Sequence, residues 1–171
     1  MMVHIYDRIL EEFRKSNFKK SYDLALSLNQ EGLNKNILTI LTISSFNLQI
    51  YSDSIKYGLK LFEKYNVKND LQLLNILGTS YSIINDYKNG NYFFHKYLSI
   101  EKKNHSVIYN YGINYFRQKN YAKSKKQFEK IISEKKDYKE AELIYGIINS
   151  ELKEYKKAKK IFKDLIKRNK N

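Results

Sequence analysis

The sequence predicts an all-α protein built from about five consecutive helical hairpins, and three observations support this prediction. Landmark residues recur every 34 positions, apolar residues recur at three- and four-residue steps, and no segment shows sustained two-residue alternation. A fixed period of about 20 to 50 residues is typical of repeat arrays. Steps of three and four residues indicate amphipathic helices. We therefore expect helices along the whole chain and no strands.

Four series of residues share this period in the second half of the chain. They are Gly78, Gly112 and Gly146; Tyr87, Tyr121 and Tyr155; Phe94, Phe128 and Phe162; and the small residues Gly90, Ser124 and Ala158. Upstream, the pairs Phe18 with Ser21 and Tyr51 with Ser54 repeat the aromatic-then-small signal. The spacing predicts a single domain over residues 1–171, with repeats at about 1–34, 35–70, 71–104, 105–138 and 139–171.

Turns are expected where the helical pattern breaks. Within repeats the breaks fall at Asn85–Asp86, Lys119–Asn120 and Lys153–Glu154, and residues 66–70 form a break between two repeats. The dipeptide Asn89–Gly90 would normally suggest a hairpin turn. Because Gly90 holds the small-residue position of its repeat, we predict that it lies in a helix.

The motif inside each repeat resembles the tetratricopeptide repeat. Leu74-x2-Leu77-Gly78-x2-Tyr81 and Ile108-x2-Tyr111-Gly112-x2-Tyr115 are similar to its first helix, with Leu or Ile in place of the usual Trp. Gly90-x3-Phe94, Ser124-x3-Phe128 and Ala158-x3-Phe162 are similar to its second helix. The last repeat departs at Glu142 and Asn149, and the usual closing proline is replaced by Lys102 and Lys136. The resemblance implies a right-handed solenoid whose first helices line a concave groove for an extended or helical peptide.

The resemblance also implies which residues would contact a partner in that groove. By position they are Tyr6, Phe13, Arg14, Thr39, Phe46, Asn47, Asn75, Thr79, Ser82, Tyr109, Ile113, Phe116 and Arg117. Aromatic residues together with arginine are typical of the residues that dominate binding energy. The alternative is that Phe46, Tyr109 and Phe116 belong to the core between helices.

Positive charge is concentrated in the C-terminal part of the chain. The net charge of the chain is +14; residues 1–100 hold 12 basic and 9 acidic residues, whereas residues 101–171 hold 20 and 9. Lysine outnumbers arginine 28 to 4, a skew that an AT-rich genome would also produce. The last helix would carry a basic surface of Lys156, Lys157, Lys160, Lys163 and Lys167. This surface is a solubilising cap, a contact for an acidic protein, or a contact for nucleic acid or an anionic membrane.

The sequence predicts no enzyme, no metal site and no cofactor. Cysteine is absent, so disulfides and thiol catalysis are excluded. His4, His95 and His105 fall in three different repeats, and no glycine-rich phosphate loop occurs. No apolar run approaches about 18 residues, and the N-terminal residues lack the apolar region of a secretory signal, so we expect a soluble cytoplasmic protein.

We therefore expect a non-catalytic adaptor or scaffold that binds a segment of another protein in its groove. One alternative is an anion-surface binder that uses the lysine-rich helix on RNA or acidic lipid. A second alternative is a dedicated chaperone of a secreted or assembly subunit. Because the last helix is apolar on one side only, with Ala158, Ile161, Phe162, Leu165 and Ile166 in one stripe, we also expect it to cap the array.

Overall fold

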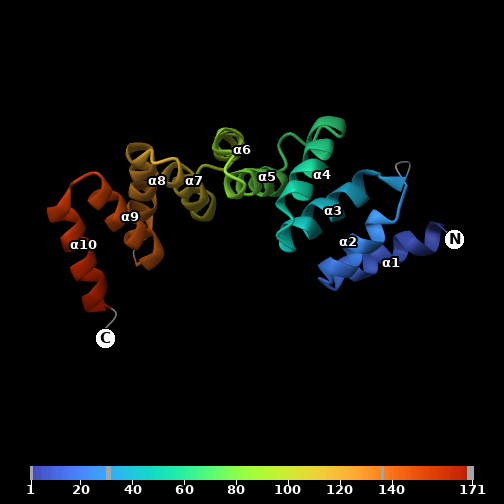
Figure 1. Ribbon diagram of the computed structural model, residues 1–171, viewed down its shortest axis with the longest axis horizontal. Coiled ribbons are helices and arrows are strands. Elements are labelled where there is room, and N and C mark those ends of the chain that lie inside the picture. Colours follow the sequence, from blue (N-terminus) through green and yellow to red (C-terminus); the bar gives the residue numbers. More distant parts are fainter. Residues whose placement is uncertain (1, 30–31, 136, 169–171) are drawn as a thin grey trace. The chain divides into compact units, whose positions relative to one another are not determined.

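The computed structural model describes residues 2–29, 32–135 and 137–168, and these ranges contain ten α-helices and no strand (Figure 1). The helices are α1 (Met2–Arg14), α2 (Phe18–Leu26), α3 (Lys35–Asn47), α4 (Tyr51–Lys64), α5 (Leu71–Ile83), α6 (Tyr87–Ile100), α7 (His105–Arg117), α8 (Tyr121–Glu134), α9 (Lys139–Glu151) and α10 (Tyr155–Arg168). The predicted all-α array of helical hairpins is confirmed. Gly90 lies inside α6, as expected.

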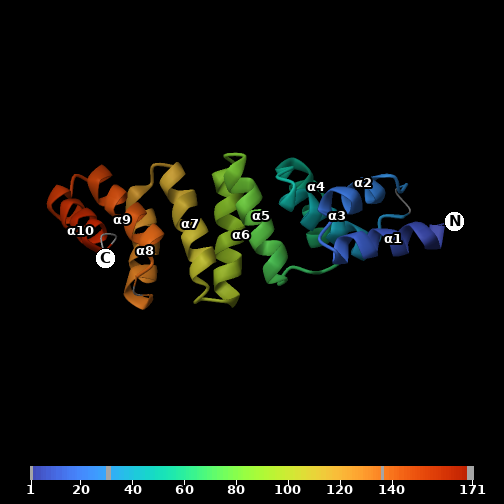
Figure 2. The same ribbon diagram turned by 90° about the horizontal axis from the view of Figure 1, so that it is seen from below.

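The chain divides into two compact units, Met1–Phe93 (unit 1) and Phe94–Asn171 (unit 2), with the boundary inside α6. In unit 1, α1 packs on α2, α3 on α4, and successive hairpins meet through α2 with α3 and α4 with α5. In unit 2, α7 packs on α8 and α9 on α10, and α8 with α9 joins the two hairpins (Figure 2). Each unit is therefore a short stack in which neighbouring hairpins share one core.

The first helix of three successive hairpins begins at a side-chain cap. In each case an Asn or Asp oxygen accepts a hydrogen bond from a backbone N–H three residues later, at 3.0 to 3.1 Å. The pairs are Asn34 with Ile37, Asp70 with Leu73, and Asn104 with Val107. Such caps satisfy amides that have no partner within the helix, so they fix where α3, α5 and α7 begin.

Two residues after the end of each hairpin's first helix, the chain has a residue with left-handed backbone. These residues are Ser16, Gln49, Asn85, Lys119 and Lys153, with φ between 58° and 66°. After α7, for example, the N–H of Asn120 returns to the carbonyl of Tyr115 at 2.9 Å, which closes the last turn of the helix. The turns that the sequence predicts at Asn85, Lys119 and Lys153 are confirmed.

Small residues bring the two helices of a hairpin together. The buried hydroxyl of Ser124 in α8 donates to the carbonyl of Gly112 in α7 at 2.8 Å.

The two residues at which the last repeat departs from the motif also form hydrogen bonds. Glu142 of α9 pairs with Arg168 of α10, and the fully buried Asn149 donates to the carbonyl of Tyr145 at 2.6 Å.

Candidate functional site

The first helix of each hairpin has a buried side and a partly exposed side. In α3 the third, seventh and tenth residues, Ile37, Leu41 and Ser44, are buried. The fifth, ninth and thirteenth residues, Thr39, Ile43 and Asn47, are at least partly exposed. The same three positions are at least partly exposed in α1, α5, α7 and α9. We call these positions the A-helix face.

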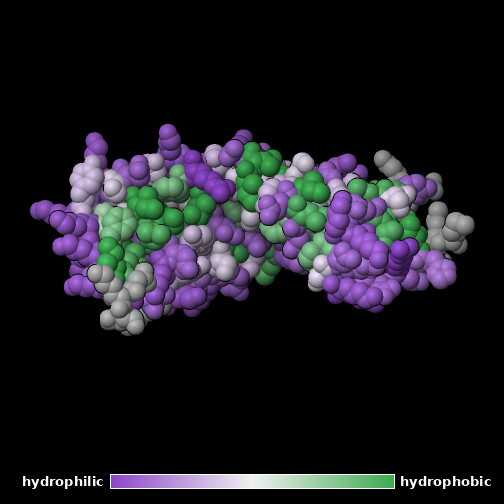
Figure 3. Space-filling model, turned by 60° about the horizontal axis from the view of Figure 1, so that its bottom comes forward, coloured by the Kyte–Doolittle hydropathy of each residue, from purple (hydrophilic) through white to green (hydrophobic). Residues whose placement is uncertain are grey.

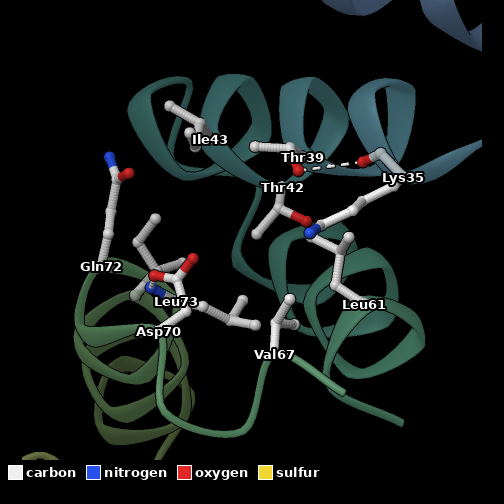
Figure 4. Close-up of a pocket in the computed structure, with 10 residues that line it drawn as sticks. Lys35, Thr39, Thr42, Ile43, Leu61, Val67, Asp70, Gln72 and Leu73 are labelled. Atoms are coloured by element: carbon white, nitrogen blue, oxygen red, sulfur yellow. Dashed lines mark hydrogen bonds between the residues drawn. The ribbon is translucent and has the colours of Figure 1, made fainter. Parts of the chain in front are cut away.

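The A-helix face of unit 1 borders a small cavity between α3 and α5, the α3–α5 cavity (Figure 4). Its volume is about 40 Å³, and it is lined by Lys35, Thr39, Thr42, Ile43, Leu61, Val67, Asp70, Gln72, Leu73 and Ile76. Aliphatic side chains form most of the wall, and the side chain of Lys35 extends into it (Figure 4). Because a water molecule needs at least about 10–15 Å³ of such space, the cavity has room for one small apolar group.

The polar groups at the rim of this cavity have defined positions. The Thr39 hydroxyl donates to the carbonyl of Lys35 at 2.9 Å. The Asp70 carboxylate caps α5 by accepting from the N–H of Leu73 at 3.0 Å. Farther along α3, outside the lining of the cavity, the exposed Asn47 donates to the carbonyl of Ile43 at 2.8 Å. The cavity is therefore bordered by fixed polar groups beside an aliphatic floor.

Three phenylalanines that we expected in the groove pack at the hairpin turns instead. Each is partly buried against the aromatic residue that begins the next helix, with ring centroids 5.6 to 6.0 Å apart. The pairs are Phe13 with Phe18, Phe46 with Tyr51, and Phe116 with Tyr121. For Phe46 and Phe116 the contacts favour the alternative interpretation, in which the rings pack between helices, and Phe13 makes the same kind of contact.

In unit 2 the predicted site residues Tyr109 and Ile113 pack against the core, whereas Arg117 does not. The ring of Tyr109 lies 5.4 Å from that of Phe128 and stacks on Tyr138 at 5.9 Å, and burial raises the pKa of Tyr109. Ile113 is partly buried against the hydrophobic cluster of unit 2 that contains Phe128. Arg117 is exposed at the end of α7.

The remaining predicted residues lie in unit 1. Arg14 is exposed, whereas the hydroxyl of Tyr6 donates to the carbonyl of Gly32 at 2.9 Å and so anchors α1. In α5, Asn75 Oδ1 and Thr79 Oγ1 are buried and have no hydrogen-bond partner within the described ranges. Ser82 is only 4% exposed, so it does not contribute to an accessible surface.

All five predicted surface lysines are exposed on α10: Lys156, Lys157, Lys160, Lys163 and Lys167. Lys157 is engaged by its neighbours, because its Nζ lies 4.9 Å from the centre of the Tyr145 ring and 3.9 Å from Glu129 Oε1. A hydrogen bond with Tyr145 raises the pKa of Lys157. All five side chains therefore contribute to the lysine-rich surface, and Lys157 also contacts neighbouring side chains.

The sequence did not indicate two polar contacts between segments far apart in the chain. His105 Nε2 lies 3.0 Å from Glu134 Oε2, and Lys125 Nζ lies 2.5 Å from Glu154 Oε1. Both pairs join residues 29 positions apart, a separation that the helical pattern does not reveal.

Within the described residues, no three histidine or carboxylate side chains are grouped to hold a metal ion. No helix in the same ranges has the length and apolar character needed to span a bilayer.

Stacked hairpins with a partly exposed A-helix face define a helical-repeat protein, a class whose members present extended binding surfaces to other molecules. The model of the tetratricopeptide repeat family matches residues 106–134 and 140–171, which lie in the α7–α8 and α9–α10 hairpins. The resemblance noted in the sequence is confirmed there.

Solved structures of MamA share this fold along nearly their whole length. Two crystal structures of MamA are 17% and 18% identical to the chain, each with a TM-score of 0.81. The alignments cover 94% and 98% of this chain and 93% and 91% of those chains. A third structure, residues 41 to the end of MamA from Desulfovibrio magneticus RS-1, is 13% identical, with a TM-score of 0.84 and coverage of 97% and 93%. No curated protein sequence matches the chain.

Proposed function

We propose that this protein is an interaction scaffold that binds a segment of another protein on the A-helix face of unit 1. The observation that carries the proposal is the α3–α5 cavity, to which Thr39 and Ile43 of that face contribute. A small aliphatic side chain of the partner would enter the cavity. Full burial of such a side chain stabilises a complex by roughly 1.5–3 kcal/mol, which is enough to set the register of the bound segment.

The polar groups beside the cavity support a peptide ligand. The Lys35 side chain reaches over the aliphatic wall (Figure 4) and would interact with a carboxylate or a backbone carbonyl of the bound segment. Arg14 and Asn47 occupy equivalent positions at the ends of α1 and α3, and both are exposed. An apolar anchor surrounded by hydrogen-bonding groups is the usual composition of a peptide-binding surface.

A displayed library of random peptides, selected on the protein, would supply ligands for the test. We expect the enriched peptides to share a small aliphatic residue and to bind with a Kd that fluorescence anisotropy can measure. Thr39→Phe fills the cavity and should weaken these peptides at least tenfold. Ser52→Phe adds the same ring to an exposed position of α4 and should leave binding unchanged.

The same titrations separate this proposal from the two alternatives. An anion-surface binder would lose affinity when Lys156, Lys160 and Lys163 are changed to Gln, and its Kd would rise steeply with salt. A dedicated chaperone would yield a single peptide sequence rather than a family with a shared anchor. Equal affinity of the Thr39→Phe variant and the unchanged protein would reject the cavity as the binding site.

A further inference from the structure

The end of unit 2 carries an exposed apolar surface formed by α9 and α10. Leu143 is 48% exposed and Ile166 is 57% exposed, and both border an open hollow of about 430 Å³ together with Phe162 and Leu165. Figure 3 shows hydrophobic side chains gathered among hydrophilic ones near the C-terminal end of unit 2. Of the apolar stripe expected to cap the array, Ala158 and Leu165 are buried, Ile161 and Phe162 are half-buried, and Ile166 is exposed, so the stripe is only partly turned inward.

In the preceding hairpin of unit 2, another helix covers the positions equivalent to Phe162 and Leu165. Phe162 and Leu165 correspond, 34 residues earlier, to Phe128 and Ile131, which are fully buried. They are buried because α9 packs over them with its third, seventh and tenth residues, Ala141, Tyr145 and Ile148. By the same repeat geometry, α10 presents the surface on which one further helix would pack.

The charges of α8, α9 and α10 indicate which kind of helix would pack on α10. In the observed interface α8 has four lysines and two glutamates, whereas α9 has one lysine and three glutamates, so a basic helix is covered by an acidic one. Lys125 of α8 bonds both carboxylate oxygens of Glu154, at 2.5 and 2.7 Å, at the turn after α9. The α10 helix is more basic still, with seven basic residues and one acidic residue.

We propose that this end of unit 2 binds an amphipathic helix of another protein, with apolar residues at i, i+4 and i+7 flanked by acidic residues. The surface is separate from the A-helix face of unit 1, so the proposal does not depend on the function proposed above. It also gives the lysine-rich helix a role as the electrostatic rim of a helix-docking site.

A second copy of the chain is a poor match for this surface. The third, seventh and tenth residues of α1 are His4, Arg8 and Glu11, all exposed and polar, so α1 lacks the apolar side with which α9 covers α8. Burial of those charged groups would be costly. Two copies joined through their α10 surfaces would bring seven basic residues from each copy together and would repel each other.

A synthetic fluorescent peptide of residues 137–151 of this chain is a suitable probe, because it contains the helix that covers the equivalent surface of α8. We expect fluorescence anisotropy to show saturable binding of this peptide to the protein. Changing Leu143 and Ile166 together to Gln should weaken binding at least tenfold without altering the melting temperature, since both side chains are already exposed. Leu26→Gln, at a side chain that is 45% exposed on α2, is the matched control and should bind normally.

Two further measurements complete the test. A peptide with Gln in place of Tyr145 and Ile148 should not bind, and changing Lys159, Lys163 and Lys167 of the protein to Gln should reduce both the affinity and its salt dependence. Binding that is unaffected by the Leu143 and Ile166 changes would overturn the proposal, as would no binding at all. Sedimentation that shows a dimer abolished by Ile166→Gln would also overturn it, because a second copy would then occupy the surface.

Discussion

Gly112 and Phe128 fit together so closely that no side chain can be added between them. A Cβ atom at Gly112 would lie 2.7 Å from Cε2 of Phe128 and 3.2 Å from Cδ2 and Cζ of the same ring. The ring is fully buried, so it has no space into which to move. Gly146 and Phe162 repeat the relationship one hairpin later, with 2.5 Å from the added Cβ to Cε1. The recurring glycine thus sets the distance between the two helices of a hairpin.

Gly112→Ala should destabilise the protein, although alanine favours a helix by about 1 kcal/mol over glycine. Overpacking against the fixed ring costs about 1–3 kcal/mol, and we expect the net loss to appear as a lower midpoint in urea denaturation followed by circular dichroism. In a Phe128→Leu background the ring atoms that cause the clash are missing, so the alanine should then be neutral or favourable.

Lys126→Ala, at an exposed position of α8, is the control for this series and should change stability by less than about 0.5 kcal/mol. If Gly112→Ala raises the urea midpoint while Phe128 is present, the close contact does not limit the packing of α7 on α8.

The period of the sequence was sufficient to locate the helices and most turns, because each repeat must fold into the same hairpin to bury its apolar stripe. It put the turns at Asn85, Lys119 and Lys153, as the structure shows. Residue preference alone would have missed Lys119 and Lys153, since lysine is uncommon in left-handed backbone. In these turns the register of the repeat overrides the local preference.

Lys119→Gly should stabilise the protein. Lys119 has a φ of 58°, a conformation that costs a residue with a Cβ roughly 1–2 kcal/mol relative to glycine. Part of this gain is lost to the greater freedom of glycine in the unfolded chain, so we expect a net stabilisation of about 0.5–1 kcal/mol. Thermal denaturation followed by circular dichroism would measure it.

Asn85→Gly provides the comparison, because asparagine tolerates left-handed backbone better than lysine does. Its φ is 66°, and its gain should be the smaller of the two. A lower melting temperature for Lys119→Gly would contradict the assignment of strain to this turn.

The candidate site was less predictable than the fold. Spacing identifies which residues share a helix face, but it does not show which of them a neighbouring ring covers. Phe46 and Phe116 were expected in the groove, and each packs instead on the tyrosine that begins the next helix. Spacing likewise could not show that Ile166 would be exposed, because exposure depends on whether another helix follows in space.

The stability of the protein should fall at acidic pH in part because Glu154 becomes protonated. The Lys125 ammonium, hydrogen-bonded to the Glu154 carboxylate, lowers the pKa of that carboxyl below its ordinary value of 4.5. A lowered carboxyl pKa adds stability above the ordinary value, and this contribution is lost as the pH falls through the pKa of the folded state. Glu154→Gln should therefore lower the melting temperature at pH 7, and the difference from the unchanged protein should shrink toward pH 3.

Glu140→Gln is a useful reference for this titration. It removes an exposed carboxylate of α9 for which the described residues show no ion pair. Its melting temperature should stay close to that of the unchanged protein across the range. A Glu154→Gln difference that is as large at pH 3 as at pH 7 would mean that the link to Lys125 does not contribute through its charge.

Two threonines on neighbouring first helices should respond in opposite ways to the same substitution. Thr42 in α3 is buried, and its hydroxyl donates to the carbonyl of Leu38 at 2.7 Å. Thr79 in α5 has a buried hydroxyl with no hydrogen-bond partner in the described part of the chain. A buried polar group without a partner costs about 1–3 kcal/mol, whereas a hydrogen bond that is made contributes about 0.5–1.5 kcal/mol.

Valine has nearly the shape of threonine, so the substitution removes the hydroxyl with little change in packing. Thr79→Val should raise stability by about 1 kcal/mol because it removes an unpaired polar atom from the interior. Thr42→Val should lower stability by a similar amount because a hydrogen bond is lost. Urea denaturation of the two variants beside the unchanged protein measures both effects. Shifts in the same direction would show that the Thr79 hydroxyl is paired in solution, for instance with an ordered water molecule.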